Sequence, residues 1–229
     1  MRKPKTAVLV LESDDILRAG AVSVLEQDGR FSVGRARNAA EARLEWSLRP
    51  SLLVLPADRE AFDPYAWLEL ARARPGVKVV LVLEAGDNPA FVRSLLQRGA
   101  CGYVERTSDA AGLPDILGRA LNGERIEEGE TLRCALAGYE VVRKRHASLL
   151  SLLEGLSDTA YASIVGPLAG DSDAETAERL SRVVRSVRDA RSEARKALLR
   201  EGFTRESLTA AVAELRLAEK TAGRLPALR

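Results

Sequence analysis

Ala7-Val-Leu-Val-Leu11 is an aliphatic run, followed by the polar turn Ser13-Asp-Asp15 and by a helical pattern from Ile16 to Glu26. A short run of this kind is typical of a strand that is buried on both faces. The same alternation of strand-like and helix-like segments recurs up to about residue 123. Five such units in ~120 residues predict an α/β domain, a doubly wound parallel sheet with helices on both faces.

The expected strands span residues 7–11, 31–34, 51–55, 77–83 and 101–104, and the expected helices span residues 16–26, 39–48, 65–74, 89–98 and 109–121. In the first helix the apolar residues Ile16, Ala19, Val22 and Leu25 share one stripe. We expect this domain to cover residues 1–123 and to be followed by a linker at residues 124–130.

Beyond Gly123 the strand pattern disappears, so residues 131–229 are predicted to form an all-helical domain. Seam positions, apolar except for His146, recur there at alternating spacings of three and four, the pattern of a coiled coil: Leu132, Ala135, Tyr139, Val142, His146, Leu149 and Leu153. A short helix over residues 157–168 is expected to break at Gly166-Pro167. Ser172 and Glu175 then form a capping box that is predicted to open one long helix to about Arg200, and Thr204 can cap a last helix over residues 206–217.

The long helix carries a second apolar face at the same spacing, at Leu180, Val183, Val187, Ala190, Ala194 and Ala197. Two seams of this kind predict a homodimer formed through helix pairing.

The composition excludes several classes of protein. The 35 Lys and Arg residues nearly balance the 33 Asp and Glu residues, which argues against a purely electrostatic nucleic-acid binder and a polybasic membrane anchor. No apolar run reaches the ~18–20 residues of a transmembrane helix. Cys101 and Cys134 form neither a disulfide framework nor a metal cluster, and a single histidine argues against a zinc site. We expect a cytoplasmic protein without a metal or cofactor.

Several short motifs occur in a fixed order along the first half of the chain: Leu17-Arg-Ala-Gly20, Arg49-Pro50, Ala73-Arg-Pro-Gly-Val-Lys78, Arg98-Gly-Ala-Cys-Gly-Tyr103 and Asn122-Gly-Glu124. In this order and spacing they resemble the CheY-like receiver domain of response regulators, of the NarL/LuxR type. The resemblance covers about half the chain. It implies a flavodoxin-like, five-stranded parallel sheet and a role in two-component signalling or a phosphorelay.

Receivers transfer a phosphoryl group to an Asp at the end of the third strand. An acidic pair holds Mg²⁺, a Ser or Thr ends the fourth strand and a Lys ends the fifth, so that positive charge neutralises the phosphoryl oxygens. The matching positions in this sequence are Pro56 for the acceptor, Glu12 and Ser13 for the acidic pair, Leu83 or Glu84 for the hydroxyl and Arg106 for the lysine. Because proline has no carboxylate, the resemblance implies a pseudo-receiver that is not phosphorylated at this position. Tyr103 matches the aromatic residue that switches in active receivers.

Three alternatives remain open in the sequence. Asp58 is a displaced acceptor if the match to the receiver motif shifts by two residues and the shift is cancelled before Asp63. Asp14 and Asp15 are either a displaced metal pair or, as we favour, the start of the first helix, where carboxylates interact well with the helix dipole. His146 is either a phosphoaccepting residue or, as we favour, a polar seam residue that sets helix register.

The long helix is strongly basic, with eight Arg and Lys residues and two acidic residues between positions 179 and 200. Arg182, Arg185 and Arg188 are candidates for contacts with DNA or RNA phosphates, and a solvated helix face explains the same pattern. Leu152-Leu-Glu-Gly-Leu-Ser157 and Leu180-Ser-Arg-Val-Val-Arg185 resemble fragments of the helix-turn-helix domain of NarL/LuxR regulators. Ala194-Arg-Lys-Ala-Leu-Leu199, Gly202-Phe203 and Leu215-Arg-Leu-Ala218 resemble the RNA-binding domain of antitermination regulators.

The sequence therefore predicts a non-enzymatic, response-regulator-like signalling protein that acts through dimerisation and protein partners. Its receiver would be held in one state, with Arg106, Tyr103 and helices 89–98 and 109–121 forming a docking face. The alternative is a DNA- or RNA-binding transcription regulator.

Overall fold

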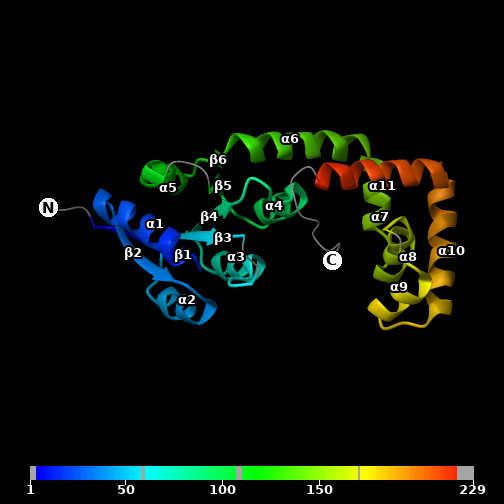
Figure 1. Cartoon of the computed structure of the whole chain (residues 1–229), viewed down its shortest axis with the longest axis horizontal. Coiled ribbons are helices and arrows are strands. Elements are labelled where there is room, and N and C mark those ends of the chain that lie inside the picture. Colours follow the sequence, from blue (N-terminus) through cyan, green and yellow to red (C-terminus); the bar gives the residue numbers. More distant parts are fainter. Residues whose placement is uncertain (1–3, 58–59, 107–109, 170, 221–229) are drawn as a thin grey trace. The chain divides into compact units, whose positions relative to one another are not determined.

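The computed structural model of the protein describes residues 4–57, 60–106, 110–169 and 171–220. The chain divides into two compact units, one that ends at Leu136 and one that begins at Ala137. Each unit is described by itself, as the receiver unit and the helical unit (Figure 1).

The receiver unit is built on a parallel sheet, which has six strands within the described residues, in the order β2-β1-β3-β4-β5-β6. The strands are β1 (Thr6–Leu11), β2 (Phe31–Ala36), β3 (Leu52–Pro56), β4 (Lys78–Leu83), β5 (Gly102–Glu105) and β6 (Ile126–Glu128). The helices are α1 (Asp15–Asp28), α2 (Ala39–Trp46), α3 (Pro64–Arg72), α4 (Pro89–Gln97) and α5 (Leu113–Leu121), with a 3₁₀ turn over Ala110–Gly112. The α/β fold class and the parallel sheet predicted from the sequence are confirmed.

Alternate residues of each strand enter different cores, because successive side chains of a strand point to opposite faces. Leu9 and Leu11 of β1 pack in the core that α2, α3 and α4 cover. Val8 and Val10 pack in the core that α1 and α5 cover. The aliphatic runs are therefore strands buried on both faces, as their composition indicated.

The sixth strand corrects the sequence analysis, which assigned residues 124–130 to a linker. Ile126 is fully buried and pairs with Gly102 of β5. Gly102 has φ +157, and a Cβ built there would lie 2.0 Å from the carbonyl oxygen of Ile126, so only glycine fits against this strand. With one apolar residue followed by two glutamates, β6 is too short to show a strand pattern in the sequence.

The apolar stripe expected along α1 is only partly buried. Val22 and Leu25 lie in the core, whereas Ala19 is exposed and Ile16 is 83% exposed. The first turn of α1 therefore extends beyond the face that contacts the sheet.

The helical unit begins within α6 (Glu130–Arg145) and continues through α7 (Ala147–Glu154), α8 (Asp158–Ala169), α9 (Asp173–Arg179), α10 (Val184–Arg200) and α11 (Arg205–Lys220). Residues of α7, α8, α10 and α11 share one core, which contains Leu149, Leu153, Ile164, Ala194, Leu198, Leu208, Ala211 and Val212. The backbone N–H of Ser207 donates to the Thr204 hydroxyl at 3.2 Å, which confirms the predicted cap of the last helix. Within the part of the chain that is described, no helix is long and apolar enough to span a membrane.

The predicted coiled-coil seam is not one continuous helix. His146 has φ −105 and ψ 23 and separates α6 from α7, and the chain turns at this point (Figure 1). Leu132 packs in a core of the receiver unit, whereas Leu149 and Leu153 pack in the core of the helical unit. The regular spacing arises from helices of two different units, so the prediction of a coiled-coil seam is wrong.

The predicted long helix is also divided. The capping box of Ser172 and Glu175 is present and opens α9, which ends at Arg179. Ser181 then adopts a left-handed conformation with φ 50, and α10 begins at Val184. Val183, expected on the apolar face, is 68% exposed.

Pro167 lies inside α8, where the sequence predicted a break. A proline has no N–H to donate to the carbonyl four residues earlier, here that of Ser163. The Nε of Arg191 donates to this carbonyl at 2.7 Å instead. The arginine of α10 therefore satisfies an acceptor that would otherwise be buried and unpaired in α8, and the helix continues.

Candidate functional site

The receiver unit brings three of its predicted pocket residues together at the carboxyl edge of the sheet. Glu12 follows β1, Glu84 follows β4 and Arg106 follows β5. In an open parallel sheet this edge is where ligands bind, because the strand ends and the loops that follow them meet there. Pro56, at the acceptor position, is the buried last residue of β3.

Arg106 bridges the two carboxylates. Its Nη2 lies 2.8 Å from Oε2 of Glu12 and its Nη1 lies 3.0 Å from Oε1 of Glu84. The other oxygen of Glu12 accepts the backbone N–H of Asp14 at 3.0 Å. Since Glu12 is only 7% exposed, these two donors replace water as hydrogen-bond partners of its carboxylate. We call Glu12, Glu84 and Arg106 the Arg106 network.

The residues around the Arg106 network do not fit the magnesium ion that receivers use. Both oxygens of Glu12 are already engaged, and Pro56 supplies no ligand. Among the described residues no group of three or more His, Cys, Asp or Glu side chains could hold a metal ion. A guanidinium group therefore supplies the positive charge at this edge.

Asp14 and Asp15 start α1, as the sequence analysis favoured. Asp14 is the N-cap, and its Oδ1 accepts the backbone N–H groups of Ile16 at 2.8 Å and Leu17 at 3.0 Å. The hydrogen bond from Leu17 is the main cause that lowers the pKa of Asp14 below its usual value. Asp15 forms an ion pair with Arg18. Asp58, the candidate displaced acceptor, lies outside the described residues.

Tyr103 is fully buried, which corrects its proposed place on a docking face. Its hydroxyl has no hydrogen-bond partner among the described residues. Burial, the largest cause, raises the pKa of Tyr103 to about 12. The side chain is a core residue in this conformation, and an exposed contact through its ring is not available.

The three candidate phosphate-binding arginines differ in their surroundings. Arg182 is exposed and forms no ion pair with any described residue. Arg185 is 92% exposed in its side chain and lies 3.9 Å from Asp189. The Nε of Arg188 lies 3.0 Å from Oδ2 of Asp173 at the start of α9.

Arg191 was not singled out in the sequence, yet it connects three helices. It donates to the Ser163 carbonyl of α8 and forms an ion pair with Asp173 of α9. The hydrogen bond from Arg188, and then that from Arg191, holds the pKa of Asp173 below its ordinary value. Part of the basic character of α10 is thus structural, while Arg182 and Arg185 are exposed to solvent.

His146 contacts an acidic residue. Its Nε2 lies 2.8 Å from Oε2 of Glu214 on α11, and Arg145 pairs with the same carboxylate. The hydrogen bond from His146 is the first cause that lowers the pKa of Glu214. His146 therefore joins the α6–α7 junction to α11, a structural role in place of the predicted seam.

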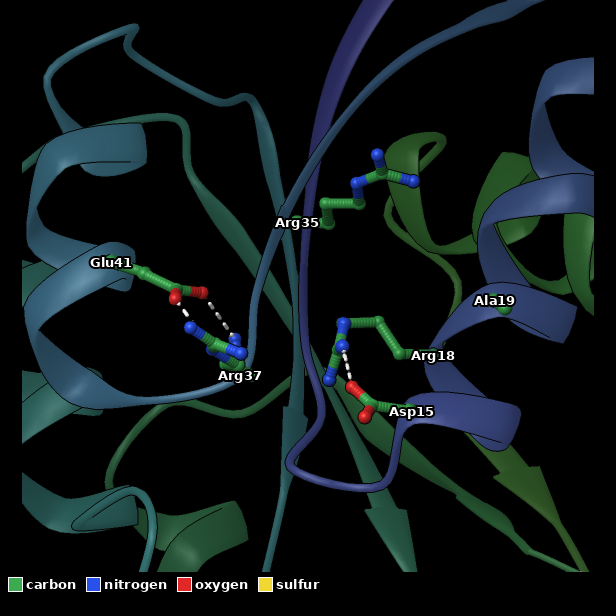
Figure 2. Close-up of a pocket in the computed structure, with 6 residues that line it drawn as sticks. All are labelled: Asp15, Arg18, Ala19, Arg35, Arg37 and Glu41. Atoms are coloured by element: carbon green, nitrogen blue, oxygen red, sulfur yellow. Dashed lines mark hydrogen bonds and ion pairs between the residues drawn. The ribbon is translucent and has the colours of Figure 1, made fainter.

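A second group of charged residues, also missed in the sequence, lines a cavity of about 300 Å³ on the β2 side of the sheet (Figure 2). Its charged residues are Asp15, Arg18, Arg35, Arg37 and Glu41. They come from α1, from β2 and the residue that follows it, and from α2, and no spacing in the sequence connects them.

A CheY-like receiver followed by a helical domain is the architecture of NarL/LuxR-type response regulators, and the homologues of this chain are such proteins. One is the transcriptional regulatory protein LiaR of Bacillus subtilis, which is 25% identical over 185 residues that cover 79% of this chain and 85% of LiaR. Another is the response regulator protein VraR of Staphylococcus epidermidis, 25% identical over 169 residues, which cover 68% of this chain and 79% of VraR. No family model matches the chain.

Among solved structures the chain is similar to RcsB of Salmonella enterica serovar Typhimurium bound to a promoter in the presence of the phosphomimetic BeF₃⁻. The TM-score is 0.56, with 17% identity over 93% of this chain and all of that chain. A second structure, of the response regulator RcsB in complex with DNA, gives a TM-score of 0.56 with 16% identity over 92% of this chain and 99% of that one. At this identity the likeness concerns the fold.

Proposed function

We propose that this protein is a DNA-binding transcription regulator of the response-regulator type. The observation that carries the proposal is the extent of its similarity to LiaR, a transcriptional regulatory protein, over 79% of this chain. A match of that length extends beyond the receiver unit, which ends at Leu136, into the helical unit. It favours the DNA-binding alternative over the scaffold for protein partners.

The helical unit supports this proposal through the arginines around the start of α10. Arg182 lies two residues before this helix and Arg185 lies in its first turn, both are exposed, and Arg188 follows. Arginine side chains in such a cluster can contact DNA phosphates, and each contact adds to the salt dependence of binding. The RcsB structures, which share the fold, contain DNA.

We further propose that the receiver unit is not switched by phosphorylation of an aspartate at the end of β3. Pro56 offers no nucleophile there, and the Arg106 network already joins the strand ends β1, β4 and β5. The Arg106 guanidinium is held by these two carboxylates, so it is already engaged without a phosphoryl group. The unit would then remain in one state and present the same surface at all times.

The assembly we propose is a homodimer on DNA in the cytoplasm. One RcsB structure contains two RcsB dimers bound to two parallel DNAs. A two-fold dimer places two copies of α10 on two half-sites of DNA, which increases both affinity and specificity. Protein partners in the same signalling pathway would contact the receiver unit.

DNA binding is tested with the full chain and labelled genomic DNA fragments, with total RNA as a second probe, between about 50 and 200 mM salt. We expect saturable binding to DNA that weakens with salt. The double variant Arg182→Ala/Arg185→Ala should bind more weakly and show a shallower salt slope, by about 0.9 for each phosphate that is no longer neutralised. The double variant Arg43→Ala/Arg72→Ala removes the same charge from exposed helix positions of the receiver unit and should bind normally.

Two results contradict the proposed function. Absence of DNA binding at the lower salt concentration would favour the scaffold for protein partners, and preference for RNA would favour an antitermination-type regulator. Equal weakening in both double variants would show a dependence on net charge and not on α10.

The state of the receiver unit is tested with radiolabelled acetyl phosphate. We expect no hydroxylamine-labile incorporation into the full chain, because an aspartyl phosphate needs a carboxylate nucleophile. Label that disappears in Asp58→Asn would identify a displaced acceptor and overturn this part of the proposal.

A further inference from the structure

The cavity on the β2 side of the sheet is lined by more positively than negatively charged side chains. Three guanidinium groups and two carboxylates line it, together with Ala19. The side chains come from α1, from β2 with the residue that follows it, and from α2 (Figure 2). A cavity with excess arginine is a site where an anion gains favourable electrostatic energy.

Two of the arginines are held in place. The Nη1 of Arg18 donates to the backbone carbonyl of Glu12 at 2.7 Å, and its Nη2 pairs with Asp15. The Nε of Arg37 donates to Oε1 of Glu41 at 2.7 Å, and Oε2 of Glu41 accepts the backbone N–H of Arg37 at 3.1 Å. Side chains fixed by such contacts lose less conformational freedom when a ligand binds.

Arg35 supplies the charge that is not neutralised. It lies on β2 opposite Val10 and forms no ion pair or hydrogen bond with the described residues. In Figure 2 the guanidinium of Arg35 carries no dashed line, whereas dashed lines join Arg18 to Asp15 and Arg37 to Glu41. All of its N–H donors therefore remain available to a ligand.

We propose that this cavity binds a small soluble phosphate compound, with Arg35 as the main contact and Arg18 and Arg37 as supporting donors. The planar guanidinium fork matches the oxygens of a phosphate group in a bidentate arrangement. A volume of about 300 Å³ is at the lower end of ligand pockets, so it suits a pyrophosphate or mononucleotide group. This proposal goes beyond the proposed DNA-binding function and gives the receiver unit a ligand in place of a phosphoaspartate.

The test uses isothermal titration calorimetry on the full chain with sodium pyrophosphate, and in parallel with ATP, AMP and sodium sulfate. We expect saturable binding of pyrophosphate or a nucleotide with one site per chain. Arg35→Ala should weaken binding by about tenfold or more, because it removes the hydrogen bonds from a charged donor to the phosphate group. Arg43→Ala removes an exposed arginine from α2 outside the cavity and should bind as the wild type does.

Arg182 and the first arginines of α10 are the other candidate phosphate contacts, so they are tested separately. The triple variant Arg182→Ala/Arg185→Ala/Arg188→Ala should keep full affinity for the small phosphates. The proposal is overturned if no phosphate compound binds at millimolar concentration, or if sulfate binds as tightly as pyrophosphate. It is also overturned if affinity disappears in the triple variant and is kept in Arg35→Ala. Failure of DNA binding leaves this proposal intact, because the two tests use different residues.

Discussion

Arg106 compensates the charge of a glutamate that is almost fully buried. Replacing it with alanine removes the guanidinium that contacts Glu12 at 2.8 Å and leaves that carboxylate with the single N–H of Asp14. We expect Arg106→Ala to lower the free energy of unfolding by about 1–3 kcal/mol, the cost of a polar group that loses a buried partner. Chemical denaturation of the full chain, read out by fluorescence or circular dichroism, measures the change.

Glu84 provides the matched control for this prediction. Its side chain is 57% exposed, so solvent can replace the contact with Arg106. Glu84→Gln should change the free energy of unfolding by only about 0–1 kcal/mol, as for other exposed ion pairs. If both variants have the same small effect, the Arg106 network does not stabilise the receiver unit.

Removal of the Tyr103 hydroxyl is predicted to increase the free energy of unfolding or leave it unchanged, in contrast to the Arg106 variant. The hydroxyl is buried without a hydrogen bond to any described residue, so its removal takes away an unsatisfied polar group. Tyr103→Phe should leave the unfolding midpoint unchanged or raise the free energy of unfolding by about 1 kcal/mol. Ile126→Val, another conservative change at a fully buried position, should lower it by about 0.5–1.5 kcal/mol and serves as the control. A loss of stability in Tyr103→Phe would show that the hydroxyl has a partner.

At the scale of the elements, sequence periodicity predicts what is local and misses what is tertiary. The strands and helices of the receiver unit follow from aliphatic runs and caps such as Asn38 and Asp63, which act within three residues. The break between α9 and α10 could not be predicted from the sequence, because the spacing of apolar residues continues across Ser181. The continuation of α8 through Pro167 also depends on a residue far along the chain, Arg191.

The candidate site shows the same division. The resemblance to receivers implies the positions of Glu12, Pro56 and Arg106, and their place at one edge of the sheet could be predicted from it. The bridge from Arg106 to Glu12 and Glu84 could not be predicted, because it depends on the side-chain geometry of residues in three different loops. The cavity around Arg35 joins residues of three elements without any motif, so only the structure reveals it.

The contact between α9 and α10 leads to a prediction about pH. Arg188 and Arg191 hydrogen-bond to Asp173 and lower its pKa below the ordinary value of 3.8. A carboxylate with a lowered pKa adds stability above its ordinary pKa and loses it as the pH falls through the folded value. The wild type should therefore be more stable than Asp173→Asn at neutral pH. The difference should begin to fall near about pH 4 and disappear only as the pH passes through the lower folded value.

Thermal unfolding of both proteins as a function of pH measures this difference. Asp189→Asn is the control, because the Asp189 side chain is 76% exposed and its contact with Arg185 is 3.9 Å long. It should follow the wild type at every pH. A constant difference between Asp173→Asn and the wild type down to strongly acidic pH would mean that the carboxylate charge is not what holds α9 to α10.

At the scale of the whole molecule, the position where the receiver unit ends can be tested directly. The sequence pattern ends this domain at residue 123, whereas the structure includes β6 and the start of α6. Ile126 and Leu132, both fully buried, belong to the two cores of the sheet. A polypeptide of residues 1–123 lacks both side chains, each of which contributes about 1.5–3 kcal/mol when buried.

We therefore expect residues 1–123 to be less stable than residues 1–136 by about 3–6 kcal/mol, from the two missing side chains alone. Since the whole stability of a small domain is only about 5–15 kcal/mol, the shorter polypeptide should be partly or largely unfolded at room temperature. Urea denaturation of both polypeptides measures the difference, and Leu132→Ala in the longer one should reproduce about 2–5 kcal/mol of it. Equal midpoints for the two polypeptides would show that the sheet is complete with five strands. The segment after Gly123 would then be the linker that its sequence pattern indicates.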